Sequence, residues 1–585
     1  MRSLGVLALA SVLPLAACGR KSSRPPGEFV QLSISDPVTL DPAWFYDTTS
    51  HSIVLNLYET LVGFKGADAS TLEPRVSERV PSRANGLVSA DGRTYVFPIR
   101  KGIRFHDGSE LTPEDVRYSL MRFMLLDRPA GPSSILLEPV AGVATARRGG
   151  KLLEEVYERV DRAVRAEGEV VTLTLKEPFA PLLTVLASWA PVLSRSWCAA
   201  HGEWDGTKAG RARLDRPDKE SSYLYDHANG SGPFLLERWD PKARELVLKR
   251  FEGYRLGPAR LSRAVLRTVD DFQTRKLLLQ AGDADAIHAD RLQLPLLRGM
   301  EGVELLDGLP ILETNPVVFF TFRIDPTANP NIGSGKLDGE GIPPDFFADK
   351  DIRRAFAHAF DYDGFIRDVN GGEGSRISGF IPEGLLGHST DGPRPPFDLE
   401  KAERFFRAAR GGEVWRKGFR FTIAYNTGSQ PREAIVTMLK RSVEGINPRF
   451  HIDARPIQWS AYLEQMNRSR LPVFLLGWSA DYPDPHAFAF PFMHSQGRLP
   501  SIQRYKNAEA DRLVTAAMRE SDPAKRARMY ARLQAVAHED IPALYLLRSG
   551  LCRVQRTWVK GFLHRPVWPD GPFSCPFYDL EVSRR

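Results

Sequence analysis

The sequence predicts a globular protein of α/β class, with mixed α and β elements and more than one domain. At 585 residues the chain is too long for one compact core, and this length is typical of two to four domains. Hydrophobic residues make up 42% of the chain and charged residues 26%, the usual mixture of globular proteins. Segments with strand and helix periodicity alternate at irregular spacing and without internal repeats, which indicates α/β or α+β lobes.

The N-terminus has the features of an export signal. An apolar stretch, 4–17, is too short to span a bilayer but suits the core of a signal peptide. It ends in Leu-Ala-Ala-Cys-Gly at 15–19, which resembles a bacterial lipobox, so we expect 1–17 to be removed and Cys18 to be acylated. The polar segment 18–28 is then a lipidated, flexible tether that anchors an exported protein to a membrane. A plain signal peptide that happens to end at a cysteine is the alternative.

Charge and cysteine content bear on the partners of the protein and on its disulfide bonds. The formal net charge of +7 is mild for this length, and the basic residues are scattered, so we expect no nucleic-acid partner. If Cys18 carries lipid, the remaining cysteines, Cys198, Cys552 and Cys575, can form at most one intramolecular disulfide. Cys552 and Cys575 are the favoured pair because both lie in the C-terminal segment, and buried free thiols are the alternative.

In the first half of the chain, alternation and helix-start signals place the elements. Residues 94–100 alternate apolar and other side chains, which predicts a half-buried strand. A helix is predicted to begin after Thr112, because Thr is a good N-cap, Pro113 suits the first helical position, and two acidic residues follow. Further strands are predicted over 171–175, 246–249 and 419–425.

In the second half, two helices are equally clear. Residues 349–360 keep an apolar stripe with a period of 3.6, and a second helix is predicted to start at Asp522 and Pro523. The Gly- and Pro-rich stretch 326–344 is interpreted as a surface insertion.

The motif GWSADYPDP, 477–485, combines two aromatic and two acidic side chains in one turn. The preceding run 472–476 has the length and composition of a strand buried on both faces, as in a parallel sheet. The motif would then begin at the carboxyl end of that strand, where α/β proteins usually place ligands. Pro483 and Pro485 stiffen the turn and hold its carboxylates in fixed directions. An Asp-Pro turn that merely ends a strand fits the same residues.

Motifs for catalysis or metal binding are missing from the sequence. It contains no Gly-x-Ser-x-Gly elbow, His-Glu-x-x-His helix or phosphate loop. His486 and His494 do not have the spacing of metal ligands, and Asp481 and Asp484 in one turn need not flank a scissile bond. We therefore expect a protein that is not an enzyme and has no cofactor or metal. A lipid-anchored hydrolase and a structural envelope lipoprotein are the rival classes.

Five motifs, in order along the chain, resemble the extracellular solute-binding proteins of ABC importers, in the peptide, dipeptide and nickel class called family 5. The likeness covers nearly the whole mature chain, and the order of the motifs makes it specific. The motifs are Leu-Asp-Pro at 40–42 with NLYETLV at 56–62, YVFPIRKGIRFHDG at 95–108 with LTPEDVRYSL at 111–120, GSGPF at 230–234, IRRAF at 352–356, and GWSADYPDP at 477–485.

The resemblance implies the two-lobed periplasmic-binding-protein fold of the large peptide binders. In that fold a hinge joins the lobes, the N-terminal lobe carries an extra subdomain, and the end of the chain returns to the N-terminal lobe. The expected divisions are 29–310 for the N-terminal lobe, with the extra subdomain roughly at 61–217, 311–540 for the C-terminal lobe, 541–585 for the return, and hinge crossings near 311–318 and 541–547.

The resemblance also implies a function and a site. The protein is expected to bind peptides between its lobes, as a monomer, and to deliver them to an ABC permease and ATPase complex from the periplasmic or extracellular side of the envelope. Asp481 matches an aspartate that holds the ligand's α-amino group, because a desolvated ammonium needs a fixed anion. Trp478 matches an aromatic wall of the side-chain pockets, and Tyr482 adds a second wall.

One departure from the family pattern leaves the ligand open. Leu475 and Leu476 stand where some oligopeptide binders carry an arginine for the ligand's carboxylate. Ligand length, and recognition of a carboxylate, are therefore not predicted. A non-peptide solute is the alternative, since the family also includes binders of nickel chelates, sugars and other small solutes, and Asp481 favours an amine-bearing one.

Overall fold

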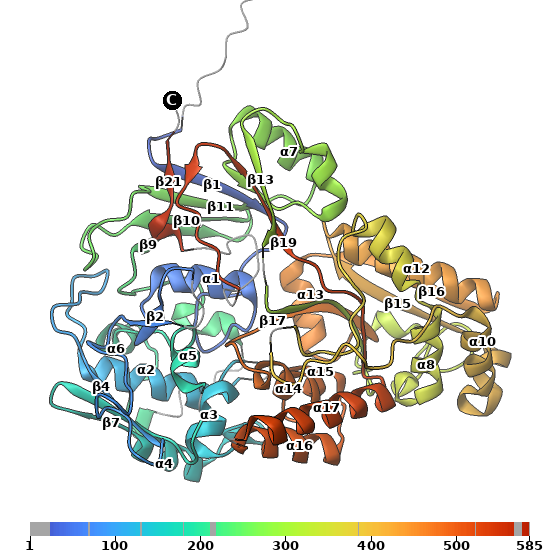
Figure 1. Ribbon diagram of the computed structural model, residues 1–585, viewed down its shortest axis with the longest axis horizontal. Helices are drawn as coiled ribbons and strands as arrows, with labels where there is room; N and C mark the ends of the chain where they lie inside the picture. The colour runs from blue at the N-terminus through green and yellow to red at the C-terminus, as the bar shows by residue number, and fades with distance from the viewer. Residues whose placement is uncertain are drawn as a thin grey trace, which may run out of the picture.

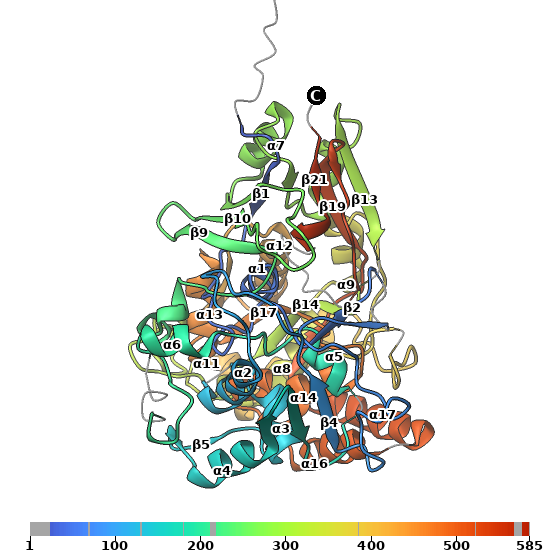
Figure 2. The same ribbon diagram turned by 90° about the vertical axis from the view of Figure 1, so that its left-hand side faces the viewer.

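The computed structural model describes residues 24–67, 71–128, 131–179, 181–210, 218–309, 311–383, 385–520, 522–566 and 576–583. Cys18 and the predicted signal segment lie outside these residues, as does Cys575. The described chain forms two bodies built on separate sheets, which we call the first and second lobes (Figure 1, Figure 2). Cys198 and Cys552 are free cysteines, the first buried and the second half-buried, and the predicted pairing of Cys552 with Cys575 stays a prediction.

A seven-stranded mixed sheet organises the first lobe. Strand β1 is parallel to its neighbours β11 and β12, and the outer strands pair antiparallel. Helix α7 (Phe272–Ala281) packs on one face through Phe272 and Leu279 (Figure 1). The strand order is β13 (Val303–Leu309), β19 (Leu551–Arg556), β12 (Ala286–Ile287), β1 (Glu28–Ser33), β11 (Arg263–Thr268), β10 (Glu245–Arg250) and β9 (Phe234–Asp240). The C-terminal part of the chain therefore supplies a strand to the lobe that begins the chain.

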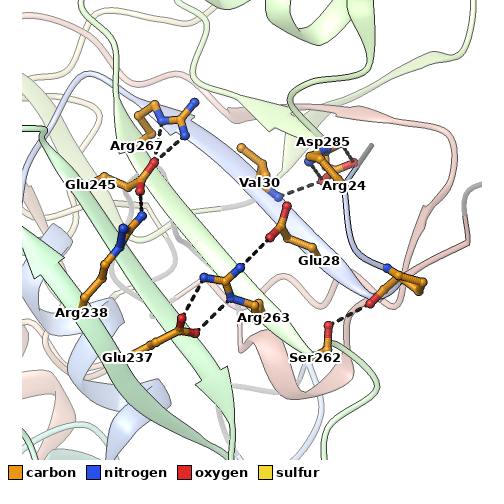
Figure 3. A network of polar contacts seen from close by, with 11 residues as sticks. Arg24, Glu28, Val30, Glu237, Arg238, Glu245, Ser262, Arg263, Arg267 and Asp285 are labelled. Carbon is orange, nitrogen blue, oxygen red and sulfur yellow. Dashed lines mark hydrogen bonds and ion pairs between the residues drawn. The ribbon is translucent and has the colours of Figure 1, made fainter. Parts of the chain in front are cut away.

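Ion pairs link strands of this sheet and hold the start of β1 (Figure 3). Arg263 on β11 pairs with Glu28 on the adjacent β1 and, across β10, with Glu237 on β9, with N–O distances of 3.2 and 2.9 Å. The pair with Glu237 is partly exposed, and pairs of this kind contribute only roughly 0.2–1 kcal/mol each. Arg24, just before β1, donates to the buried carboxylate of Asp285 at 2.8 Å. The point where the predicted tether joins the lobe is therefore held in place.

The rest of the first lobe contains a three-stranded antiparallel sheet, β4 (Thr94–Pro98), β8 (Val170–Thr174) and β7 (Val164–Glu167), with α2 (Pro113–Leu126) and α4 (Glu154–Ala163). The predicted start of α2 is confirmed, because the Thr112 side chain accepts from the Asp115 N–H and Asp115 reciprocates. The other elements are α1 (Thr48–Leu57), β2 (Val62–Phe64), β3 (Leu72–Pro74), α3 (Ser134–Ala141), β5 (Arg147–Arg148), β6 (Lys151–Leu152), α5 (Leu182–Leu186), α6 (Arg195–Ala200), β20 (Val559–Lys560) and β21 (Glu581–Val582).

A buried ionic cluster ties α2 to the segments around it. Both terminal nitrogens of Arg122 donate to Asp41, at 2.6 and 2.7 Å, and one of them also donates to Glu203 at 3.0 Å. The hydroxyl of Ser222 donates to Asp41 at 2.7 Å. The Arg122 side chain is only 1% exposed and that of Asp41 is fully buried, so Asp41 depends on Arg122 for its counter-charge.

The second lobe is built on the sheet β17 (Val473–Ser479), β14 (Glu313–Phe320), β18 (Ala543–Tyr545) and on the parallel pair β15 (Phe419–Asn426) and β16 (Phe450–Ile457). Both predicted helices of this half are confirmed, as α8 (Lys350–Ala359) and α17 (Pro523–Asp540). The remaining helices are α9 (Tyr362–Gly364), α10 (Leu399–Ala408), α11 (Glu413–Lys417), α12 (Gln430–Ile446), α13 (Trp459–Asn467), α14 (His486–Met493), α15 (Arg498–Gln503) and α16 (Ala508–Arg519). None of the described helices is both long and apolar enough to cross a bilayer.

The strand predicted before the GWSADYPDP motif is present as β17, but the prediction of a parallel neighbour is wrong. β17 pairs antiparallel with β14 and forms an edge of its sheet. The Tyr462 hydroxyl on α13 bonds both backbone groups of Leu475, accepting from the N–H at 2.6 Å and donating to the carbonyl at 2.9 Å. This side chain satisfies the free edge of β17 at Leu475, in the middle of the buried stretch, without a second neighbouring strand.

Candidate ligand-binding site

A cavity of about 360 Å³ lies where the two lobes face each other. The first lobe lines it with residues of β1 and α1, and the second lobe lines it with residues of β14, α12, α13, β17 and α15. Gly477, Trp478 and Asp481 of the motif are among the lining residues, so residues of the motif do face a cavity. Pockets of this size that combine apolar walls with a few polar groups are the usual form of small-molecule sites.

Asp481 is one of the carboxylates that line this cavity, together with Asp47, Asp290 and Glu313. The hydroxyl of Tyr46, from the first lobe, donates to its Oδ2 at 2.8 Å. Burial raises the pKa of Asp481 to about 7, against the opposing effects of Tyr46 and the Arg498 guanidinium. A carboxylate that is this poorly compensated gains strongly when a cation comes to rest beside it.

Trp478 forms an aromatic wall jointly with the first lobe. Its indole N–H donates to the Ala487 carbonyl at 2.9 Å, which fixes the ring. The ring meets Tyr46 edge to face with centroids 5.3 Å apart, and Tyr46 meets Trp189 in the same way at 5.3 Å. Arg498 lies over the Tyr46 ring, 4.9 Å from its centroid. Tyr46 therefore contacts both the predicted anion, Asp481, and the predicted aromatic wall, Trp478, and joins them to Trp189 of its own lobe.

Tyr482 and Asp484 lie differently from the other two motif side chains. Tyr482 does not line the main cavity but a smaller one beside it, and its ring packs against Phe179 of the first lobe at 6.1 Å. Asp484 accepts hydrogen bonds from both terminal nitrogens of Arg526, at 2.7 and 2.8 Å, and from the backbone N–H of His486 at 2.8 Å. Asp484 is thus a structural residue that anchors the turn to α17.

A cation that the sequence did not reveal lies in the same cavity. Arg432, in the first turn of α12, donates to the Asn426 side chain at 2.6 Å and lies over the Trp459 ring at 5.1 Å. Burial lowers its pKa, and no carboxylate within the described ranges reaches ion-pair distance of its guanidinium. The cavity therefore offers a half-buried cation as well as the anion Asp481.

The lobes touch at the rim of this cavity. The N–H of Gln430, at the start of α12, donates to the Asp290 carboxylate of the first lobe at 3.1 Å. Two residues earlier, Gly428 has a φ of +86°, and a Cβ there would lie 3.0 Å from the Asp270 carbonyl oxygen. Close approach of the two lobes thus requires glycine at this position. The structure has the lobes closed around the site.

Comparison with known proteins identifies the family. The model for bacterial extracellular solute-binding proteins, family 5 (middle region), matches residues 74–499. The chain belongs to this family. The "probable D,D-dipeptide-binding periplasmic protein DdpA" of Escherichia coli (strain K12) is 24% identical over 568 residues, which cover 97% of this chain and 96% of that protein.

Solved structures share the fold of this family 5 protein. The Helicobacter pylori protein DppA in complex with the peptide STSA has a TM-score of 0.74 at 22% identity, over 96% of this chain and 98% of its own. AppA from Bacillus subtilis in complex with a nonapeptide has a TM-score of 0.75 at 20% identity, over 96% of this chain and 100% of its own. The prediction of a two-lobed solute-binding fold is confirmed.

The raised pKa of Asp481 predicts a pH-dependent stability of the ligand-free family 5 protein. Between pH 3.8 and about 7 the native state keeps a proton on Asp481 that the unfolded chain has released. The free energy of unfolding is therefore highest at low pH and falls as the pH rises toward 7. Relative to Asp481→Asn, the native protein should lose up to about 2–3 kcal/mol of unfolding free energy between pH 5 and 8. Denaturant unfolding at both pH values measures this. An unchanged difference between the two proteins would show that Asp481 is not desolvated.

Proposed function

We propose that the protein captures di- or oligopeptides in the cavity between its lobes and delivers them to the membrane permease of an ABC importer. The observation that carries the proposal is Asp481, a desolvated carboxylate that faces the cavity and lacks a full counter-charge. A ligand's α-ammonium group supplies that charge. The named relatives and structural neighbours that bind dipeptides and peptides support the same ligand class.

Arg432 extends the proposal to the other end of a peptide. Its half-buried side chain lines the cavity and has no carboxylate at ion-pair distance within the described part of the chain. A peptide held by Asp481 through its ammonium and by Arg432 through its carboxylate would leave neither ion unpaired. This arginine comes from α12 and not from the strand before Gly477, where the family pattern suggested one.

The experiment is retention of peptides without turnover. The protein is incubated with a mixture of dipeptides, freed of unbound ligand and denatured, and the released molecules are identified by mass spectrometry. We expect intact dipeptides with free amino groups, in amounts that reach one per protein. Amino acids that accumulate with time would indicate a hydrolase, and the absence of any retained peptide would contradict the proposed ligand class.

We further propose that Cys18 is lipidated, that 18–28 tethers the protein to a membrane, and that the lobes comprise 29–310 and 311–540 with 541–585 returning to the first. The return is supported by β19 between β13 and β12 of the first sheet. Cys18→Ser should release the protein from the membrane fraction or leave the signal peptide uncleaved, because acylation requires the thiol. Immunoblots of fractionated cells measure both, and unchanged fractionation and processing would contradict the anchor.

A further inference from the structure

His51 is a further polar residue of the cavity that holds Asp481 and Arg432. It lies on α1 and is among the residues that line this cavity. The imidazole packs against Trp189 with centroids 4.1 Å apart and against Phe45 at 5.5 Å, and only 5% of the residue is exposed. These contacts hold the ring in one orientation. A fixed ring can select ligands by the position of their hydrogen-bonding groups.

The hydrogen bonding of this ring fixes its tautomer. Nε2 lies 2.8 Å from the Ser188 carbonyl oxygen, which can only accept. Nε2 therefore carries the hydrogen and Nδ1 carries a lone pair. Burial lowers the pKa of His51 to about 4, so the ring is neutral near pH 7. Within the described ranges no donor reaches Nδ1, which leaves this nitrogen as an uncharged acceptor for a ligand.

A neutral acceptor suits a different ligand group from the one that Asp481 takes. A charged ammonium binds more strongly to a carboxylate than to an imidazole. Besides its ammonium group, the peptide backbone itself carries N–H donors, and these are neutral. A buried acceptor left without a donor costs free energy, so a site with such an acceptor rejects analogues that lack the donor.

We propose that His51 is a specificity-determining residue whose Nδ1 accepts a hydrogen bond from a backbone N–H of the bound peptide. The inference rests on the proposed function and adds a substrate class to it. The protein should select peptides whose amide nitrogen carries hydrogen and discriminate against peptides that are N-methylated there or continue with proline. Neutral His51 should keep this preference between about pH 6 and 8.

The test compares alanyl-alanine with alanyl-N-methylalanine by calorimetric titration of the native protein and of His51→Phe and His51→Gln. The native protein should bind the methylated peptide about tenfold more weakly, the value of one net hydrogen bond. In His51→Phe, which lacks an acceptor, the two affinities should differ less than about twofold. His51→Gln, whose amide oxygen can accept, should recover part of the difference, which a purely structural role of His51 would not produce.

The outcomes separate this inference from the proposed function. If the native protein binds both peptides equally well, His51 does not read the N–H, and the peptide-binding proposal stands. The same conclusion follows if methylation costs His51→Phe as much affinity as it costs the native protein. If the native protein binds neither peptide, the proposed function fails and the inference fails with it.

N-acetylated alanyl-alanine serves as control. Acetylation removes the ammonium group that Asp481 is proposed to bind, so it should lower affinity equally in the native protein and in His51→Phe.

Discussion

Asp481→Ala is expected to weaken the binding of a dipeptide by about 3–5 kcal/mol, which is two to three and a half orders of magnitude in Kd. The reason is that the variant leaves the ligand's ammonium desolvated between closed lobes without its anion. The side chain lines the cavity, and its contact with Tyr46 at 2.8 Å shows that the carboxylate is positioned from both lobes. Calorimetric titration of the native and variant proteins with one dipeptide measures the loss.

The matched control is Asp484→Asn, in the same turn. Asp484 is bound to Arg526 and does not line the cavity, so its replacement should change dipeptide affinity only a few-fold. Trp478→Ala should lower affinity through lost packing of the aromatic wall, without selectivity for the amine. A similar loss in Asp481→Ala and Asp484→Asn would mean that the turn acts only as a structural unit.

Arg122→Ala is expected to have the largest effect on stability. It leaves the buried carboxylate of Asp41 without its counter-ion and removes one ionic contact of Glu203, and removing one partner of such a cluster typically costs about 3–5 kcal/mol of unfolding free energy. Denaturant unfolding followed by a first-lobe probe such as Trp204, which is buried beside α2, measures the change.

The control for Arg122 is Arg93→Ala. Arg93 pairs with Asp91 at 2.8 Å, but both side chains are about half exposed, so its loss should cost less than about 1 kcal/mol. If Arg122→Ala destabilised the protein no more than Arg93→Ala, the cluster would not be acting as a buried ionic unit.

Local features of the fold could be predicted from the sequence because their causes are local. The start of α2 follows from the capping preferences of Thr112 and Pro113, and β4 and α8 follow from apolar periodicity. The pairing of β17 was predicted wrongly, since a run of apolar residues shows that a strand is buried but not what lies beside it. In the structure a tyrosine hydroxyl on α13 occupies the place that a second strand would have taken.

Of the residues at the candidate site, some could likewise be predicted from the sequence and others could not. Asp481 and Trp478 could be chosen because one short motif contains them, and both line the cavity. Tyr46, Arg432 and His51 could not, because only the fold brings them near Asp481 and Trp478 from distant positions in the chain, and none stands in a recognisable motif. The role of Asp484 also depends on a distant residue, Arg526, which no pattern near the turn predicts.

The central claim is that Asp481 binds a ligand's amino group between the lobes. Titration of the native protein and Asp481→Asn with a dipeptide and its N-acetyl derivative tests it most directly. Asn keeps the shape of the side chain and one acceptor oxygen but removes the negative charge and replaces the other oxygen by an NH2 donor. Acetylation should cost the native protein about a hundredfold or more in affinity and Asp481→Asn less than about threefold. An equal cost of acetylation in the two proteins would contradict the claim.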